Sequence, residues 1–496
     1  MSIANLGVRS LLLTQSLVGM RAQLGDMQRQ LATGKRADDY AGLGIDRGLT
    51  VGLRAQLSAI GSYQDTVKSV GVRLELAQTA LSRIADIGRE TKALAAQMAS
   101  PEGRVTAQTL AMSSLGEILG LLNTRAGDRY LFAGVSNDGP AVETLANILD
   151  GDGTRAGLRQ VMAERRQADL GAGGLGRLTV SQPSPTSVAI AEEATVFGLK
   201  LTAISSTFNG ATVAGPAGAP PEMSVDLGAT NPAAGETLRL SFTLPDGSIE
   251  AITLTASASA NPAAGEFTIG ADPATTAANL QAAVSGAIGH LARTALTAAS
   301  ALAASDNFFN IDAGRPPQRV DGPPFDTATG LIDGTAADTV SWYIGDMSAQ
   351  PVRSTATARV DQSITVQYGM QANEEGIRWQ LQHVAALAAM PLPEGDPDID
   401  GRAGALAERL RVGLGVPPGI QTVETIQSEL AGAQTTLKAS EGRHRQANAT
   451  LANLLEDIEG VSNEEVAAKI LAMQTNLQAS LQVTARLFQT SILNYL

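Results

Sequence analysis

The 496-residue chain contains no cysteine, and Phe, Trp and Tyr together make up only 3% of it. The absence of cysteine excludes disulfide bonds and cysteine-based zinc sites. It also suits a protein that crosses compartments and must not cross-link. With so few large rings, a core must be built mainly from Ala, Leu, Ile and Val, whose small side chains suit close packing of helix on helix.

Excess positive charge is also lacking. The formal net charge is −13, which argues against nucleic-acid binding, because nucleic-acid-binding domains carry a basic surface. No apolar run approaches the roughly 18 residues of a membrane span. The N-terminal stretch MSIANLGVRSLLLTQS has neither a long apolar core nor a small-residue cleavage site. The sequence therefore predicts no nucleic-acid partner, no membrane insertion and no cleaved signal peptide.

Residues that could carry chemistry are scarce. His290, His383 and His444 are far apart, and none belongs to an H-E-x-x-H motif. GAGGLG at residues 171–176 matches G-x-G-x-x-G, but a polar, helical RRQADL precedes it and a strand-like RLTV follows, the reverse of a dinucleotide site. We therefore predict no enzymatic activity, no catalytic residue, no cofactor and no metal. Each histidine is interpreted as an ordinary surface or helix-face residue, and GAGGLG as a turn.

Heptad patterns at both ends of the chain are the clearest signal that is present. In residues 13–31, apolar side chains recur at spacings of four and three, as in a coiled-coil seam, and TGKRADDYAGLG then breaks the helix. A second seam from Leu53 predicts a helix of about fifty residues with a break near Pro101. Near the other end Gly460 interrupts a helix, and Ser462 with Glu465 forms a capping box that starts the last one.

The two terminal seams need partners, because isolated amphipathic helices are marginal in water. They can pair with each other, which brings the chain ends together, and they can also pair with neighbouring copies. The residues alone favour neither an intramolecular bundle nor assembly. The predicted assembly seam consists of Leu13, Leu17, Met20, Leu24, Met27, Leu31, Val466, Ile470, Met473, Leu477, Leu481, Leu487 and Ile492.

Residues 186–365 differ from both ends, because they are rich in Thr, Ser, Gly, Ala and Pro. TLRLSFTLPDGSIEAITLT alternates apolar and polar residues around a Pro-Asp-Gly turn, which predicts a hairpin. Asp272 before Pro273 predicts the start of a helix. The predicted fold class is α+β, with helices from both chain ends and a β-rich insert. The predicted domains are 1–38 and 461–496 (halves of a terminal coiled coil), 39–185 and 366–460 (a helical core), and 186–365 (the insert).

QLATGKRADDYAGLGIDRGL at residues 30–49 resembles the N-terminal signature of flagellins, in which a Leu/Gln seam ends in a Ser/Thr-Gly-Lys/Arg turn followed by Asp-Asp and Ala-Gly. The C-terminal MQTNLQASLQVTARLFQTSILNYL is similar to the flagellin end. The resemblance covers about residues 1–140 and 365–496 and leaves out the insert. It implies a structural protein in which both chain ends form the inner coiled coil and the insert projects outward.

GDRYLFAG at residues 127–134 is similar to a segment of the flagellin-like hook-associated proteins, in which a Tyr-x-Phe-x-Gly strand follows the long helices. On that interpretation Tyr130 and Phe132 lie on one face of the strand, since side chains repeat every two residues. They would clamp a hairpin onto the helical core, and Gly134 would let the chain turn.

The resemblance also implies partners and a location. The chain would self-assemble with itself and with other flagellar axial proteins, and it would be exported unfolded through the flagellar type III apparatus with the help of a chaperone. We favour a subunit of the hook–filament junction. A flagellin of the filament itself is the alternative, and a flagellin-like protein with a binding or adhesive insert is the second.

Overall fold

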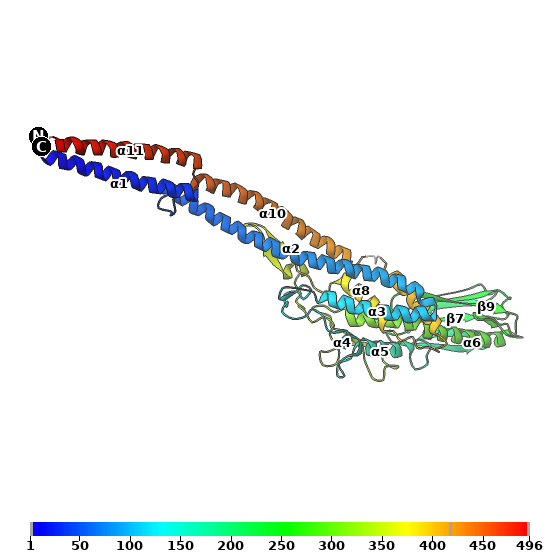
Figure 1. Cartoon of the computed structure of the whole chain (residues 1–496). Coiled ribbons are helices and arrows are strands. Elements are labelled where there is room, and N and C mark those ends of the chain that lie inside the picture. Colours follow the sequence, from blue (N-terminus) through cyan, green and yellow to red (C-terminus); the bar gives the residue numbers. More distant parts are fainter. Residues whose placement is uncertain (1–2, 416–418, 494–496) are drawn as a thin grey trace. The chain divides into compact units, whose positions relative to one another are not determined.

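The computed structural model describes residues 3–415 and 419–493, with side chains described for residues 11–12, 14–415 and 419–486. The fold is α+β, as predicted: long helices come from both parts of the chain that flank a β-rich centre (Figure 1). Contacts divide the chain into two compact units. Unit 1 comprises Met1–Ser69, Arg359–Thr365 and Thr435–Leu496, and unit 2 comprises Val70–Ala358 and Val366–Gln434.

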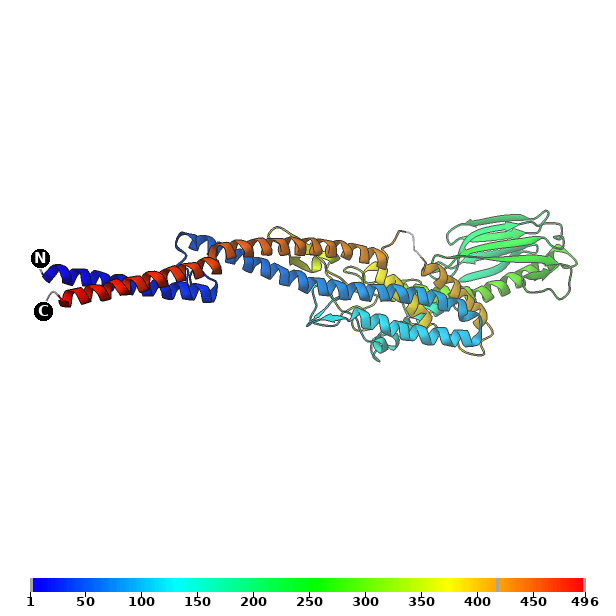
Figure 2. The same ribbon diagram turned by 45° about the horizontal axis from the view of Figure 1, so that its top comes forward.

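In unit 1, α1 (Ile3–Thr33) and α11 (Asn463–Leu493) run antiparallel and side by side (Figures 1 and 2). Ser462 caps α11 as predicted, because its Oγ accepts a hydrogen bond from the Glu465 amide at 3.3 Å. A short 3-10 helix, Gly44–Asp46, leads into α2 (Arg47–Ala95), and α10 (Val423–Glu459) ends beside Gly460. The boundary between the units falls within α2 and within α10.

The long second helix forms because its apolar stripe is continuous. Of the predicted seam, Leu74, Leu81 and Ile84 are completely buried in unit 2. The helix has 49 residues, and a new one, α3 (Pro101–Leu122), starts where Ser100 accepts a hydrogen bond from the Gly103 amide. The predicted length and the break near Pro101 are confirmed.

By length and composition α3 is apolar enough to cross a membrane, and a third of its most apolar window is buried. This is a weak indication, since core helices of soluble proteins pass the same test. One face of α3, including Leu115, Ile118 and Leu122, is buried, and the helix packs along α8 (Glu375–Ala389). We interpret α3 as a core helix of unit 2.

The rest of the helical part of unit 2 is built around α7 (Thr297–Phe309), which packs on α5, α8 and α9. Trp342 is completely buried beside Phe309, and its indole N–H donates to the Phe309 carbonyl at 2.9 Å. Small elements complete this part. They are α4 (Leu145–Asp150), α5 (Leu158–Leu170), α9 (Ile399–Gly413), β1 (Arg125–Ala126), β2 (Arg129–Tyr130), β11 (Gln318–Val320) and β12 (Leu331–Asp333). The paired strands β13 (Thr357–Arg359) and β14 (Thr365–Gln367) each span the division between the units.

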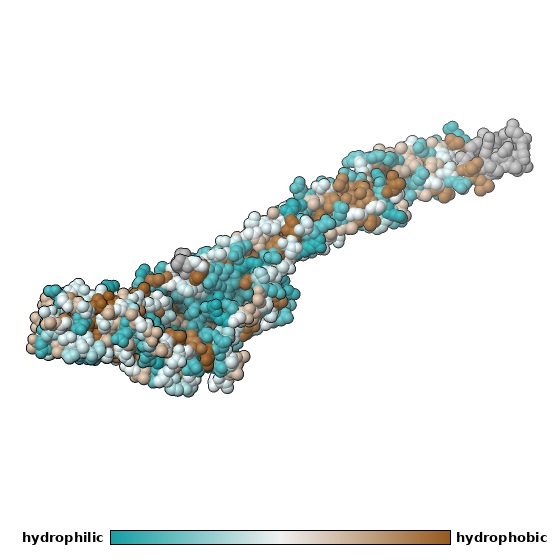
Figure 3. Space-filling view, turned by 180° about the vertical axis from the view of Figure 1, so that it is seen from behind, coloured by the Kyte–Doolittle hydropathy of each residue, from teal (hydrophilic) through white to brown (hydrophobic). Residues whose placement is uncertain are grey.

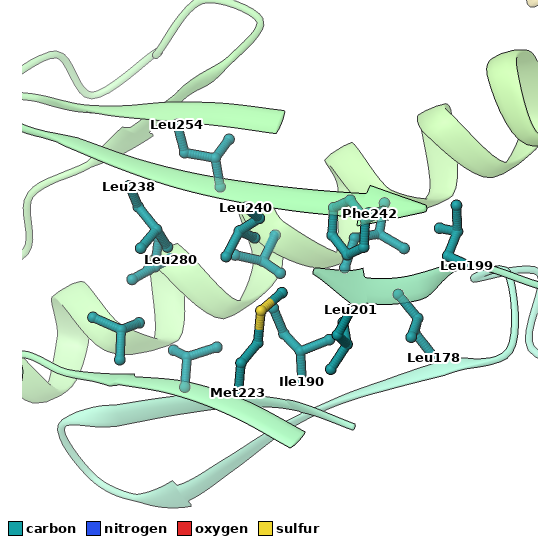
Figure 4. Close-up of a cluster of buried hydrophobic side chains, with 14 of the residues drawn as sticks. Leu178, Ile190, Leu199, Leu201, Met223, Leu238, Leu240, Phe242, Leu254 and Leu280 are labelled. Carbon is teal, nitrogen blue, oxygen red and sulfur yellow. The ribbon is translucent and has the colours of Figure 1, made fainter. Parts of the chain in front are cut away.

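Two four-stranded sheets and one helix form a β module within unit 2. Leu240 of one sheet and Met223 of the other point toward one another between them, and Leu280 of the helix joins the same core (Figure 4). All pairings are antiparallel except β9 with β10. The strand order of the first sheet is β3 (Leu178–Ser184), β4 (Ser187–Glu192), β7 (Glu222–Asp226) and β6 (Thr212–Ala217). The strand order of the second sheet is β10 (Glu266–Thr268), β9 (Ile249–Ser257), β8 (Thr237–Thr243) and β5 (Lys200–Ser206). The helix is α6 (Pro273–Leu291).

Local sequence signals account for the module. The β8–β9 hairpin turns at Gly247, whose φ of 80° favours glycine. The Asp272 side chain accepts from the Thr275 amide at 2.7 Å and caps α6, with Pro273 at its first position. Both predictions are confirmed. The core of the module runs from Leu178 to Ala299, whereas the predicted domain boundaries at 186 and 365 stay predictions.

Candidate assembly interface

The contact between α1 and α11 follows the predicted heptads. On α1, Leu17, Met20, Leu24 and Met27 are half-buried while the side chains between them are exposed. On α11, Val466 and Ile470 are buried, and Met473 and Leu477 are half-buried. Each helix thus turns its apolar stripe toward the other, and burial is deepest at the start of α11.

Two predicted seam residues lie off this contact. Leu481 is 42% exposed, and the half-buried positions beyond Leu477 are Ser480 and Thr484. Because one residue turns an α-helix by about 100°, Leu481 points away when Ser480 is covered. Leu31 is 38% exposed. Both side chains are thus exposed in the single chain, and their place in the assembly seam stays a prediction. The side chains of Leu13, Leu487 and Ile492 lie outside those the structure describes.

Both helices of the pair are interrupted where they meet the rest of unit 1, and the two interruptions are hydrogen-bonded to each other. The Arg36 amide donates to the Glu459 carbonyl at 2.7 Å, and the Val461 amide donates to the Gly34 carbonyl at 3.1 Å. Gly34 ends α1 with a φ of 69°, a conformation that glycine adopts without strain. The two breaks therefore form one backbone junction.

Side chains fix the loop of residues 34–46 at this junction. The Asp39 carboxylate accepts from the Gly42 amide at 2.9 Å, and Asp38 pairs with Arg29 at 3.0 Å. Arg54 donates to Glu459 at 2.7 Å and to the Tyr40 hydroxyl at 3.2 Å. The hydrogen bond to Glu459 raises the pKa of Arg54. No local pattern indicates that residues 54 and 459 meet, because this contact depends on tertiary pairing.

Large apolar side chains also lie on the outside of unit 1 (Figure 3). On α1 and α11 they lie away from the contact between these two helices, and on the loop Ile45 is 98% exposed. A monomer that leaves this much apolar surface uncovered presents candidate contacts for other molecules. Among the described side chains, those on the two helices are Leu11, Leu12, Val18, Leu31, Leu471, Leu481 and Val483.

The GDRYLFAG segment belongs to unit 2. Phe132 is completely buried, and its carbonyl accepts from the Ala372 amide at 2.8 Å. Gly134 has a φ of 66°, and a Cβ there would lie 2.8 Å from the Asp346 Cβ, so a glycine is required. The prediction that Tyr130 and Phe132 share one strand face is wrong. The strand ends at Tyr130, whose ring is half-buried and lies 5.1 Å from the Arg125 guanidinium.

The histidines and the glycine-rich motif were the candidates for catalysis or ligand binding. His290 is exposed and pairs with Asp398, whereas His383 and His444 are buried. These two lie on α8 and α10, so of the surface or helix-face interpretation the helix-face alternative applies to them. Within the part of the chain that the structure describes, no three His, Asp or Glu side chains are grouped to hold a metal ion. GAGGLG forms the turn between α5 and β3, as predicted.

One comparison with known proteins bears on this geometry. The family model described as the bacterial flagellin N-terminal helical region matches residues 5–137, which include α1, the junction loop, α2, α3 and the GDRYLFAG segment. No curated protein matches the chain. Flagellins are structural, non-enzymatic proteins of the bacterial flagellum that self-assemble with other axial subunits. The N-terminal part of the chain is therefore similar to the N-terminal helical region of bacterial flagellins.

Proposed function

We propose that this chain self-assembles at the hook–filament junction of the bacterial flagellum as a hook-associated protein. The observation that carries the proposal is the GDRYLFAG segment, which resembles that of junction proteins. Its Phe132 is completely buried, and packing against Asp346 requires Gly134. The packing of this fold therefore explains why the Tyr-x-Phe-x-Gly pattern has Phe at position 132 and Gly at position 134.

The assembly seam is the second part of the proposal. Met20, Leu24 and Leu477 remain half-exposed in a single chain, so further burial is available to neighbouring copies. The partners are other copies of the chain, other hook-associated proteins and flagellin. Export proceeds through the flagellar type III apparatus with the help of a chaperone. The cysteine-free sequence supports this route, since no disulfide holds the chain folded.

Localisation in isolated flagella tests the proposal against a filament flagellin. The loop of residues 258–265 in the β module is exposed, so an epitope inserted between Pro262 and Ala263 leaves the core intact. We expect gold-labelled antibody only at the base of the filament, next to the hook. Label along the whole filament would show that the chain is a flagellin of the filament and not a junction protein. Absence of label from flagella would contradict both functions.

A matched control places the same epitope in a buried site. Insertion after Leu240, which is completely buried, should prevent folding and remove the label altogether. A label that persisted in this control would show that the antibody reports something other than the folded subunit.

A further inference from the structure

Asn209 is the only asparagine in the chain that a glycine follows. Asn209 and Gly210 form the turn between β5 and β6, in which the Ala211 amide donates to the Phe208 carbonyl at 3.3 Å. Gly210 has a φ of 80°, and a Cβ there would lie 2.9 Å from the Thr230 hydroxyl oxygen. The turn therefore requires a glycine directly after the asparagine.

The Asn209–Gly210 turn lies at the end of the β module that faces away from α9. β5 and β8 form an antiparallel pair whose two ends differ. At one end, Asp246 in the β8–β9 turn pairs with Arg409 of α9 at 2.7 Å. At the other end, Ser206 ends β5 and the Asn209–Gly210 turn follows, with both of its residues exposed. Water therefore reaches this turn.

The two groups of the turn that could react with each other are not held by hydrogen bonds. Within the part of the chain that the structure describes, the Asn209 side-chain amide has no hydrogen-bond partner, and the Gly210 amide donates to no acceptor. The backbone of Asn209 is held instead. Its N–H donates to the Glu236 carboxylate at 3.1 Å, and its carbonyl accepts from the Thr230 hydroxyl at 3.4 Å. Since Gly210 has no side chain, nothing of its own shields its amide nitrogen.

We propose that Asn209 is a site of spontaneous deamidation, with water as the co-reactant. The Gly210 amide nitrogen loses its proton and attacks the side-chain carbonyl carbon of Asn209. The new C–N bond closes a succinimide ring, and the side-chain nitrogen leaves as ammonia. Water then adds to one carbonyl of the ring and breaks its C–N bond, which leaves aspartate or isoaspartate. The reaction consumes water and releases ammonia without any oxidation or reduction.

The product carries a negative charge where the folded chain already has one. The Glu236 carboxylate accepts from the amides of Asn209 and Ala233, at 3.1 and 2.9 Å, and so joins the β5–β6 turn to the loop between β7 and β8. A carboxylate on residue 209 is repelled by Glu236 at this short range. Isoaspartate also lengthens the backbone by a methylene group. Deamidation should therefore loosen the contact between the turn and the loop.

Mass spectrometry of the full-length protein, incubated folded and then digested with pepsin in acid, tests the reaction. We expect Asn209 to be converted, and its rate should rise about tenfold from pH 7 to pH 8, because the deprotonated fraction of an amide far below its pKa rises tenfold per unit. Asn261 is the matched control. It is exposed in the same module, but Pro262 follows it and has no N–H. No conversion at Asn209, or equal conversion at both positions, would overturn the proposal.

Two variants separate the reaction from its consequence. Asn209→Gln keeps the amide but places its carbon one bond farther from the Gly210 nitrogen, so it should stay unmodified while the wild type is converted. Asn209→Asp introduces the charge from the start. Hydrogen exchange should be several-fold faster at residues 209 and 233 in fresh Asn209→Asp than in fresh Asn209→Gln, and the aged wild type should resemble Asn209→Asp.

The remaining outcomes count against the proposal. Equal exchange in the two fresh variants would show that the added charge leaves the turn joined to its neighbouring loop, and the structural consequence would be overturned. An aged Asn209→Gln protein that loosens as much as the aged wild type would place the modification at another residue.

Discussion

At the scale of single residues, the molecule buries a histidine that no functional site uses. The ring nitrogen Nδ1 of His383 lies 2.7 Å from the Trp379 carbonyl, and Nε2 faces Gly413 so closely that a Cβ there would come within 2.1 Å. The Trp379 indole N–H donates to the Gly413 carbonyl at 2.6 Å. Burial lowers the pKa of His383 to about 4, opposed by the hydrogen bond to the Trp379 carbonyl and, less, by the charge of Asp246. The neutral ring therefore fits this site and the charged ring does not.

Protonation of His383 at low pH should destabilise the folded chain. His383 has a pKa of about 6.5 in the unfolded chain and of about 4 in the folded chain. Protonation of His383 therefore leaves the free energy of unfolding unchanged above pH 6.5 and lowers it as the pH falls toward 4. The loss attributable to His383 should reach about 3 kcal/mol at pH 4. Denaturation followed by Trp fluorescence should show a shallower pH dependence for His383→Gln. The exposed His290 serves as control: if His290→Gln flattens the curve equally, His383 is not the cause.

Phe132 offers a second test at this scale. Because it is completely buried, Phe132→Ala should cost about 3–5 kcal/mol of unfolding free energy. Val135, three residues on and 55% exposed, is the control, and Val135→Ala should cost less than about 0.5 kcal/mol. Chemical denaturation of both variants gives the comparison. Equal costs would remove the packing role assigned to Phe132.

At the scale of elements, the sequence predicted helices and hairpins better than it predicted which side faces inward. Asp272 with Pro273 marks the start of α6, and the alternation around Leu240 marks β8, because these signals act over a few residues. Spacing alone did not decide whether Leu481 or Ser480 faces α1, because positions one residue apart fit a heptad equally well until the partner helix is known. The strand predicted through Phe132 failed for a similar reason, since contacts with Ala372 and Met370 replace the ladder.

At the candidate interface, local spacing was predictable from the sequence and distant contacts were not. Eight of the apolar positions on α1 and α11 follow from spacing alone. The contact between Arg54 and Glu459, by contrast, joins residues 405 positions apart, which no local pattern reveals. The exposure of Ile45 was equally hidden, because an isoleucine beside a helix start is expected to pack inward.

The α1–α11 pair should be graded in stability along its length. Ile470 is 8% exposed and its neighbour Leu471 is 65% exposed, so Ile470→Ala should cost about 2–4 kcal/mol where this pair unfolds and Leu471→Ala almost nothing. Hydrogen exchange in dilute monomer should show amide protection that declines from Val466 toward Thr484. Uniform strong protection along α11 would contradict the gradient.

At the scale of the whole molecule, the β module and the predicted insert do not coincide. The module has its own core from Leu178 to Ala299, whereas residues 297–365 include α7 and Trp342, which are buried among the helices of unit 2. Leu175 and Gly289 lie close together, because a Cβ on Gly289 would be 3.6 Å from the Leu175 side chain. The chain therefore leaves and re-enters the helical part at neighbouring points.

Excision between Arg177 and Gly289 keeps α7 and Trp342 in the remainder, and of the cluster Ala168, Phe197, Val320 and Ala328 it removes only Phe197. Deleting residues 178–288 and joining Arg177 to Gly289 through a short Gly-Ser linker should leave a remainder that unfolds cooperatively by circular dichroism. Deleting residues 190–360 should abolish cooperative unfolding, because it removes Phe308, Phe309 and Trp342, all completely buried. A cooperative transition for the larger deletion and none for the smaller would restore the boundaries predicted at 186 and 365.

The pairing of the first helix with the last also fixes the order in which the chain can fold. During synthesis α1 emerges first, and its partner α11 follows only after more than four hundred residues, as the 405-residue separation of Arg54 and Glu459 illustrates. Contacts between such distant segments close a very large loop and form late. Until α11 has been synthesised, the apolar stripe of α1 lacks the helix on which it packs in the finished fold. The α1–α11 contact therefore forms only after most of unit 2 is available to fold.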